Sequence, residues 1–134
     1  MPELPEVETS IRALREPLLG EVFTEARLYW PRHIDRPDPQ SFQERIPGLR
    51  VEELDRRGKY MVFRLSGGET LIVHLRMTGH LSVVERDTVL QDHTHTILGL
   101  ASGKELRFRD PRKFGRVYLV RDPQEVLGLS LIHI

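Results

Sequence analysis

The first nine residues, MPELPEVET, bring together a proline and two glutamates that could perform covalent chemistry. A small residue at position 2 permits removal of Met1, which leaves Pro2 with a free secondary amine. Such an amine can attack an aldehyde carbon and form an iminium ion, an electron sink of the kind that lysine Schiff bases provide. Its reference pKa of about 8 leaves more of it unprotonated at neutral pH than a lysine amine.

Glu3 and Glu6 follow the proline within one helical turn. Either carboxyl group could donate or accept protons in a reaction that the amine begins. Two glutamates in the first turn of a helix also stabilise it by interacting with the helix dipole. The spacing alone leaves both interpretations open.

Two histidines alternate in DHTHT, so on a strand His93 and His95 would project from the same face. A zinc site needs about four ligands, and no further ligand cluster of suitable spacing is evident. We therefore expect no metal in this chain.

The segment KELRFRDPRKFGRVYLVR is strongly basic although the chain has a net charge of zero. The segment has seven Lys and Arg residues and two acidic residues, which leaves a local excess of +5. Such a run is typical of a solvated charged face, but it also fits a nucleic-acid contact.

Two helices are predicted near the N-terminus. Val7, Ile11, Leu14 and Leu18 have helical spacing, so we expect a helix from Pro5 to Leu18. In DPQSFQERI, Asp38 is a typical N-cap and Pro39 suits the first helical position, which predicts a short second helix.

Most of the remaining chain is predicted to form strands. Short runs rich in β-branched and aromatic residues are separated by turn signals such as SGGE, MTGH and ASGK. We expect a mainly β fold with α additions, namely a two-layer β-sandwich of about eight strands behind the N-terminal helix. The expected strands are residues 21–30, 48–54, 59–66, 69–76, 80–84, 93–100, 104–109 and 115–120.

Length and composition predict one domain. The chain has 134 residues and no cysteine, which fits a reducing compartment. No apolar run reaches the roughly 20 residues of a membrane span, so we expect a cytoplasmic location and no membrane partner.

The last residues are unusual. LSLIHI is what a common sequencing-library adapter gives when translated in frame, so we expect residues 129–134 to be a non-native tail after a domain of residues 1–128. The alternative is a native apolar continuation of the helix that DPQEVLG begins.

MPELPEVET, RRGKY, HLRMTG, HTH and DPRKFG, in this order, resemble the N-terminal catalytic domain of bacterial formamidopyrimidine-DNA glycosylases. The resemblance implies a DNA repair enzyme that excises oxidised purines, 8-oxoguanine and formamidopyrimidines, and cleaves the abasic strand by β,δ-elimination. It implies that Pro2 is the nucleophile, Glu3 the acid that protonates the opening sugar, and Glu6 a supporting carboxylate.

The same resemblance assigns DNA contacts. It implies that Lys59 contacts a DNA phosphate and assists catalysis, and that His93 contacts a phosphate near the lesion, while His74 is structural. Met77 and Phe114 match wedge residues that enter the base stack, and Arg112 matches the arginine that reaches the orphaned cytosine. Lys113 is the remaining expected DNA contact.

The family's helix-two-turn-helix domain and zinc finger have no counterpart in this sequence, so we expect no cofactor in this chain and impaired activity of the chain alone. We expect a monomer that acts on damaged double-stranded DNA. Two alternatives remain, a non-catalytic DNA-binding fragment and an enzyme of the endonuclease VIII type for oxidised pyrimidines. The endonuclease VIII type is less consistent with this sequence, because such enzymes usually have glycine where Leu4 stands. Their wedge residues also differ from Met77, Arg112 and Phe114.

Overall fold

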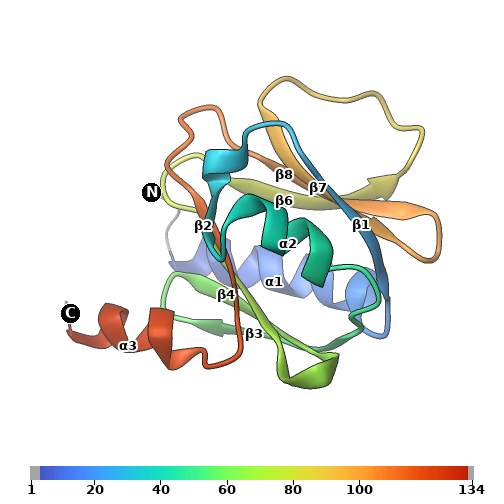
Figure 1. Ribbon diagram of the computed structural model, residues 1–134. Helices are drawn as coiled ribbons and strands as arrows, with labels where there is room; N and C mark the ends of the chain where they lie inside the picture. Colours follow the sequence, from blue (N-terminus) through green and yellow to red (C-terminus); the bar gives the residue numbers. More distant parts are fainter. Residues whose placement is uncertain (1–3, 133–134) are drawn as a thin grey trace.

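Two β-sheets pack face to face in the computed structural model, which describes the backbone of residues 4–132 and the side chains of residue 9 and residues 11–128 (Figure 1). One sheet has the strand order β1-β7-β8-β6, and the other has the order β2-β9-β5-β4-β3. All pairs are antiparallel except β2 with β9. The strands are β1 (Phe23–Leu28), β2 (Ile34–Arg36), β3 (Val51–Arg57), β4 (Tyr60–Leu65), β5 (Thr70–His74), β6 (His80–Glu85), β7 (Thr94–Leu100), β8 (Lys104–Arg109) and β9 (Arg116–Val120).

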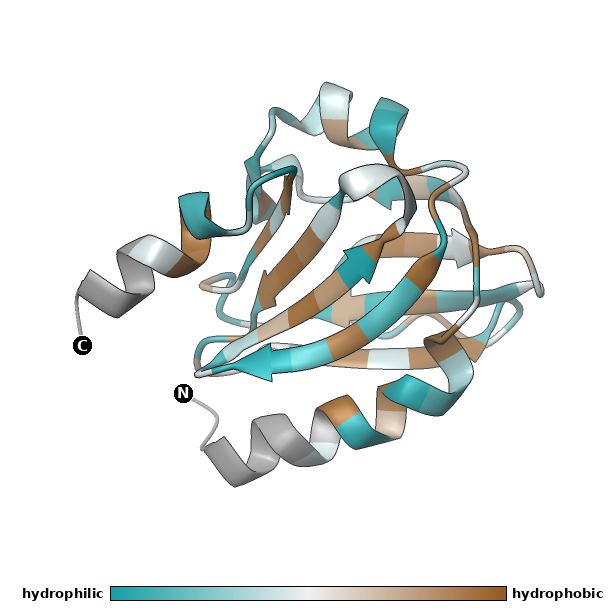
Figure 2. Cartoon of the chain, turned by 90° about the horizontal axis from the view of Figure 1, so that it is seen from below, coloured by the Kyte–Doolittle hydropathy of each residue, from teal (hydrophilic) through white to brown (hydrophobic). Residues whose placement is uncertain are grey.

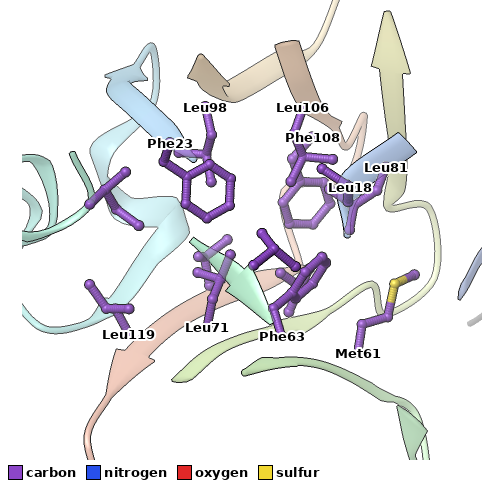
Figure 3. Close-up of a cluster of buried hydrophobic side chains, with 14 of the residues drawn as sticks. Leu18, Phe23, Met61, Phe63, Leu71, Leu81, Leu98, Leu106, Phe108 and Leu119 are labelled. Atoms are coloured by element: carbon purple, nitrogen blue, oxygen red, sulfur yellow. The ribbon is translucent and has the colours of Figure 1, made fainter. Parts of the chain in front are cut away.

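The core lies between the two sheets. Alternate residues of each strand point inward, as in Leu106 and Phe108 of β8, because side chains of a strand alternate between its faces. Figure 3 shows side chains from both sheets meeting in this layer, with Phe23 and Phe108 opposite Phe63. Apolar burial of this kind is the main favourable term in folding.

Two helices cover the open sides of the sandwich. Helix α1 (Leu4–Leu18) packs against β3 and β6, which are edge strands of different sheets. Figure 2, which views the molecule from below, shows α1 lying across this opening. Helix α2 (Pro39–Arg45) packs against β1 and β2 at the opposite edges.

The outer face of the five-stranded sheet carries a smaller apolar cluster. Helix α3 (Gln124–Ile132) contributes Val126 and Leu127, which pack against Ile72 and Tyr118. The backbone of α3 continues to Ile132, which leaves the origin of residues 129–134 an open prediction.

The structure confirms the mainly β sandwich and both predicted N-terminal helices. Asp38 caps α2 as predicted, since its side chain accepts a hydrogen bond from the Ser41 amide at 3.0 Å. Residues 4–132 contain nine strands, and the unpredicted one is β2. Within the same residues, no helix is long and apolar enough to cross a membrane.

Candidate nucleic-acid interface

One end of the sandwich gathers the motifs that are far apart in the sequence. β3, β5 and β8 end there, and β4, β6, β7 and β9 begin there, because the strands alternate in direction within each sheet. The connections at this end include the turn 58–59, the loop 75–79, the loop 110–115 and the segment 29–33 between β1 and β2. They carry Lys59, Met77, Arg112, Lys113 and Phe114, and His93 lies just before β7 at the same end.

The N-terminal end of α1 also points to this end of the molecule. The Arg15 side chain donates a hydrogen bond from Nε to the Leu54 carbonyl at 2.9 Å, which fixes the level of α1 beside β3. From Arg15 back to Leu4 the helix rises by about 16 Å. From Leu54 forward to Lys59 the strand extends by about the same distance. The start of α1 and the hairpin lysine therefore reach the same level.

Two of the expected catalytic residues, Pro2 and Glu3, lie outside the residues that the structure describes. Glu6 is placed only as a backbone position in the first turns of α1. What the structure contributes is the position of the helix that follows them.

The two expected wedge residues are exposed apolar side chains. Met77 is 48% exposed and Phe114 is 51% exposed, although large apolar side chains are usually buried. With Arg76 and Arg116 they line a surface hollow of about 510 Å³. The Arg112 side chain lies beside them, with Nη1 3.8 Å from Sδ of Met77. The structure thus brings Met77, Arg112 and Phe114 together from two loops.

The backbone at this end is held in an uncommon conformation. Three described residues other than glycine have a positive φ: Arg76 at 58°, His93 at 67° and Lys113 at 61°. This region is sparsely populated by residues with a Cβ and costs about 1–3 kcal/mol each. Arg76 lies in the loop 75–79, Lys113 lies in the loop 110–115 and His93 lies just before β7, so the surrounding contacts must hold all three in place.

The buried carboxylate of Asp110 joins two of the loops. Its Oδ1 accepts a hydrogen bond from the Thr78 hydroxyl at 2.6 Å, and its Oδ2 accepts one from the Gly115 amide at 2.7 Å. The Thr78 hydroxyl oxygen accepts a further hydrogen bond from the Arg112 amide at 3.2 Å. Burial alone would raise the pKa of Asp110, but the His33 ring, the Thr78 hydroxyl and the Gly115 amide outweigh it and lower the pKa to about 2. The carboxylate is therefore ionised at neutral pH.

The main chain of Asp110 makes hydrogen bonds with His93, His95 and Lys113. Its amide donates a hydrogen bond to the His93 carbonyl at 2.9 Å, and its carbonyl accepts one from the Lys113 amide at 3.2 Å. The same carbonyl lies 2.8 Å from Nε2 of His95, so this nitrogen must carry the proton. The His95 ring is buried.

The prediction that His93 and His95 share one face is wrong. Strand β7 begins at Thr94, and the positive φ of His93 turns this residue out of the strand. His93 is exposed whereas His95 is buried. Exposure fits the expected role of His93 in DNA contact, and it leaves His95 as part of the framework. No group of three or more possible metal ligands occurs in the described part of the chain.

A further buried histidine completes the layer beneath the loops. His33 lies in the short 3₁₀ helix η1 (Pro31–His33), with Nε2 3.7 Å from Oδ2 of Asp110 and Nδ1 3.1 Å from the Thr96 hydroxyl. Burial is the largest cause of its lowered pKa. The ring is thus neutral at pH 7 and packs on Phe108 at a centroid distance of 4.1 Å.

His74 lies on the side of the site that faces the hairpin. Its Nδ1 accepts a hydrogen bond from the Arg76 amide at 3.0 Å, and its ring meets Tyr60 edge-on at 4.6 Å. Burial, then the charges of Arg76 and Lys59, lower its pKa to about 4. Tyr60 pairs with His74, so the preceding hairpin lysine, Lys59, lies near the end of β5.

The basic segment is divided by the fold. Arg107 is buried against Glu105, with Nη2 2.9 Å from Oε1, and makes no basic surface. Lys113 is exposed and places Nζ 5.3 Å from the ring centre of Trp30, within cation–π range. Arg116 approaches the same ring at 5.8 Å. The basic segment therefore does not form one continuous charged face, because Arg107 is buried and Lys104 and Arg121 lie at the opposite end of the sandwich from Lys113.

Sequence reasoning missed Asp110, Thr78, His33 and Trp30. Asp110 had the only readable signal, because an aspartate directly before proline is typical of a turn held by side-chain hydrogen bonds. The other three act through contacts with residues at least 32 positions away, such as Thr78 with Asp110 and His33 with Thr96, which no local pattern records.

The sequence is similar to a known protein family. A family model described as the formamidopyrimidine-DNA glycosylase N-terminal domain matches residues 1–117. A formamidopyrimidine-DNA glycosylase of Herpetosiphon aurantiacus is 50% identical over 121 residues, which are 90% of this chain and 44% of that protein.

Solved structures agree in fold. The Lactococcus lactis Fpg in complex with DNA that contains an abasic site has a TM-score of 0.89 at 31% identity, covering 98% of this chain and 47% of that one. MutM in complex with DNA that contains carbocyclic 8-oxo-G has a TM-score of 0.88 at 31% identity, covering 98% and 48%. The chain spans less than half the length of these proteins.

Proposed function

Because the chain belongs to the formamidopyrimidine-DNA glycosylase family, we propose that it supplies the catalytic half of a base-excision repair enzyme that removes oxidised purines from double-stranded DNA. The substrates are 8-oxoguanine and formamidopyrimidines, and the enzyme both excises the base and cleaves the abasic strand. It works as a monomer in the bacterial cytoplasm and needs no cofactor within this chain.

In the proposed reaction the amine of Pro2 forms a bond to C1′ of the damaged nucleotide. The bond between C1′ and the base breaks, and the base leaves with the electron pair and takes up the proton that the Pro2 amine loses. Glu3 gives a proton to the ring oxygen as the sugar opens, which leaves an iminium ion between Pro2 and C1′. Glu6 supports the proton transfers, and successive β- and δ-elimination release the strand ends.

The wedge assignment rests on exposure and neighbourhood. An enzyme that acts on a base within a duplex must first extrude it, at a cost of a few kcal/mol, and an inserted side chain can fill the gap. Met77 and Phe114 are exposed apolar side chains of suitable size, and Arg112 lies beside them with donors for an orphaned base.

Phosphate contacts complete the proposal. Lys59 at the hairpin, His93 before β7 and Lys113 on the loop 110–115 lie at the same end of the sandwich as the wedge residues. Phosphate contacts from such positions fix the register of the protein on DNA and carry no sequence information.

One observation carries the proposal. The strand ends place Met77, Arg112 and Phe114 at the same end as Lys59, and the level of α1 beside β3 brings the start of the helix there too. The position of this helix start supports the proposal that a nucleophile at the N-terminus acts on a nucleotide that these side chains extrude.

Borohydride trapping tests it. The purified chain is incubated with duplex DNA that contains an abasic site, the imine is reduced, and the intact mass is measured. We expect an adduct only on molecules that have lost Met1. A variant with one extra residue before Pro2 is the matched control and should form none. Loss of Met1 without any adduct would show that this chain does not carry the chemistry alone, and that it is a non-catalytic fragment.

The lesion class is tested separately. Trapping is compared on duplexes that contain 8-oxoguanine or an oxidised pyrimidine. Preference for 8-oxoguanine is expected, and preference for the pyrimidine would favour the endonuclease VIII type of specificity instead.

A further inference from the structure

Five of the expected DNA-contacting residues lie next to one buried group. The Asp110 side chain is fully buried, and neither the family comparison nor the sequence motifs assign it a role. Its carboxylate binds the Thr78 hydroxyl and the Gly115 amide, and its main chain binds the His93 carbonyl and the Lys113 amide. The residues held in this way, directly or through an adjacent position, are Met77, His93, Arg112, Lys113 and Phe114.

Thr78 connects the loops 75–79 and 110–115, which carry the expected wedge residues and are called the wedge loops below. Its hydroxyl gives its single proton to Asp110 at 2.6 Å, and its oxygen accepts the Arg112 amide proton at 3.2 Å. The loop with Met77 and the loop with Arg112 and Phe114 are therefore joined by two hydrogen bonds through one oxygen atom. One of these bonds goes to an ionised acceptor, which makes it stronger than a neutral hydrogen bond.

The strained backbone explains why such a connection is needed. Arg76 and Lys113 both have a positive φ, one in each wedge loop. Residues in this conformation persist only when neighbouring contacts impose it. The Asp110 and Thr78 contacts restrain the loop 110–115 at the Lys113 and Arg112 amides and join it to the loop 75–79, in which the His74 ring holds the Arg76 amide.

We propose that Thr78 and Asp110 are positioning residues that lock the loops 75–79 and 110–115 into one rigid wedge, so that Met77, Arg112 and Phe114 enter a duplex as a unit. The lock is a property of the free protein, whereas its use in opening DNA rests on the proposed function.

The first test measures the lock without DNA. Amide hydrogen exchange is followed by NMR in the free chain, in Thr78→Val, which has a similar shape but lacks the hydroxyl, and in Thr78→Ser, which retains it. Thr78→Val should speed exchange at the Arg112 and Gly115 amides about tenfold, as expected for loss of a hydrogen bond to a charged group.

Two controls make this test decisive. Thr78→Ser should remain within about twofold of the parent chain, because the hydroxyl is retained. The Gly103 amide, which donates to the Leu100 carbonyl at the opposite end of the sandwich, should keep its exchange rate in all variants. Unchanged exchange at Arg112 in Thr78→Val, or an equal rise at Gly103, would overturn the lock.

The second test measures its use on DNA. A duplex carries an abasic-site analogue opposite the fluorescent base 2-aminopurine, whose emission rises when it is unstacked. Thr78→Val should lower this rise, and Thr78→Ser should restore it. The assay needs no covalent step, so failure of trapping at Pro2 leaves its result intact. An equal rise in all three proteins would show that the locked loops do not open the duplex.

Discussion

At the scale of single residues, the ionised Asp110 links stability to pH. Its pKa is lowered to about 2 in the folded chain from an ordinary value of 3.8, so folding favours the charged form. The stabilisation is therefore fully present above about pH 5 and is lost as the pH falls toward 2. A difference of this size corresponds to about 2 kcal/mol in the free energy of unfolding.

Asp110→Asn should remove this pH-dependent contribution. We expect the variant to be less stable than the parent by about 2 kcal/mol at pH 7, because the amide cannot act as an anion for the Thr78 hydroxyl and the Gly115 amide. The difference should shrink toward zero near pH 2. Urea unfolding of both proteins from pH 2 to pH 7 measures it, and a constant difference across this range would contradict the assignment.

His74 provides a test of where Lys59 lies. Burial is the largest cause of its low pKa of about 4, and the Lys59 ammonium lowers it further. In Lys59→Met the pKa of His74 should rise but stay below its ordinary value of 6.5, since the ring remains buried. NMR titration of the ring protons gives the shift directly. An unchanged pKa would place the hairpin lysine away from β5 and weaken its proposed role beside the phosphate.

At the scale of elements, close packing fixes the loop 110–115 at the start of β9. A Cβ at Gly115 would lie 2.7 Å from Cζ of Phe108, 2.8 Å from Oδ2 of Asp110 and 3.0 Å from the His74 carbonyl. Gly115→Ala should therefore destabilise the fold by about 2 kcal/mol through overpacking and displace Phe114.

Gly128→Ala is the matched control for this substitution. A Cβ there meets only the Gln124 side chain at 3.5 Å, within helix α3, so alanine should stabilise the chain by about 0.5 kcal/mol. Thermal unfolding of the two variants decides the matter. If Gly115→Ala melts like the parent chain, the loop is not packed as described.

The elements also show how far sequence reasoning reaches. Helix α1 follows from the spacing of Ile11, Leu14 and Leu18, and the strands follow from alternating apolar residues bounded by turns, because both signals are local. Strand β2 was missed since its three residues are held by pairing with β9, more than 80 positions later. The prediction that His93 and His95 share one face was wrong for a related reason. The hydrogen bond from the Asp110 amide to the His93 carbonyl helps to hold a positive φ at His93, so the strand begins one residue later than the pattern suggested.

The same distinction applies to the candidate site. Met77, Arg112 and Phe114 could be proposed from their motifs, and the structure brings them together. The layer beneath them, made by Asp110, Thr78 and His33, depends on tertiary contacts between η1, the loop 75–79 and the loop 110–115. Positioning groups of this kind have no local signature, because each is an ordinary polar residue until the fold supplies its partner.

At the scale of the whole molecule, a net charge of zero conceals a local group of basic residues. Lys59, Arg76, Arg112 and Lys113 gather where the strand ends meet, while Glu105 neutralises Arg107 and Arg27 within the sheet. A binding surface for a polyanion therefore needs no excess of positive charge in the chain as a whole. Electrostatic attraction should then depend on which end of the sandwich a charge occupies.

Two lysines of the basic segment allow this to be tested. Lys113 and Lys104 are both exposed, but Lys113 lies on the loop 110–115 and Lys104 begins β8 at the opposite end. If the loop end faces DNA, Lys113→Ala should weaken binding to an abasic-site duplex and reduce the slope of log affinity against log salt by about 1, the value for one lost phosphate contact. Lys104→Ala should leave the slope unchanged. Fluorescence anisotropy over a series of salt concentrations measures both, and equal slopes for the two variants would place the DNA elsewhere on the molecule.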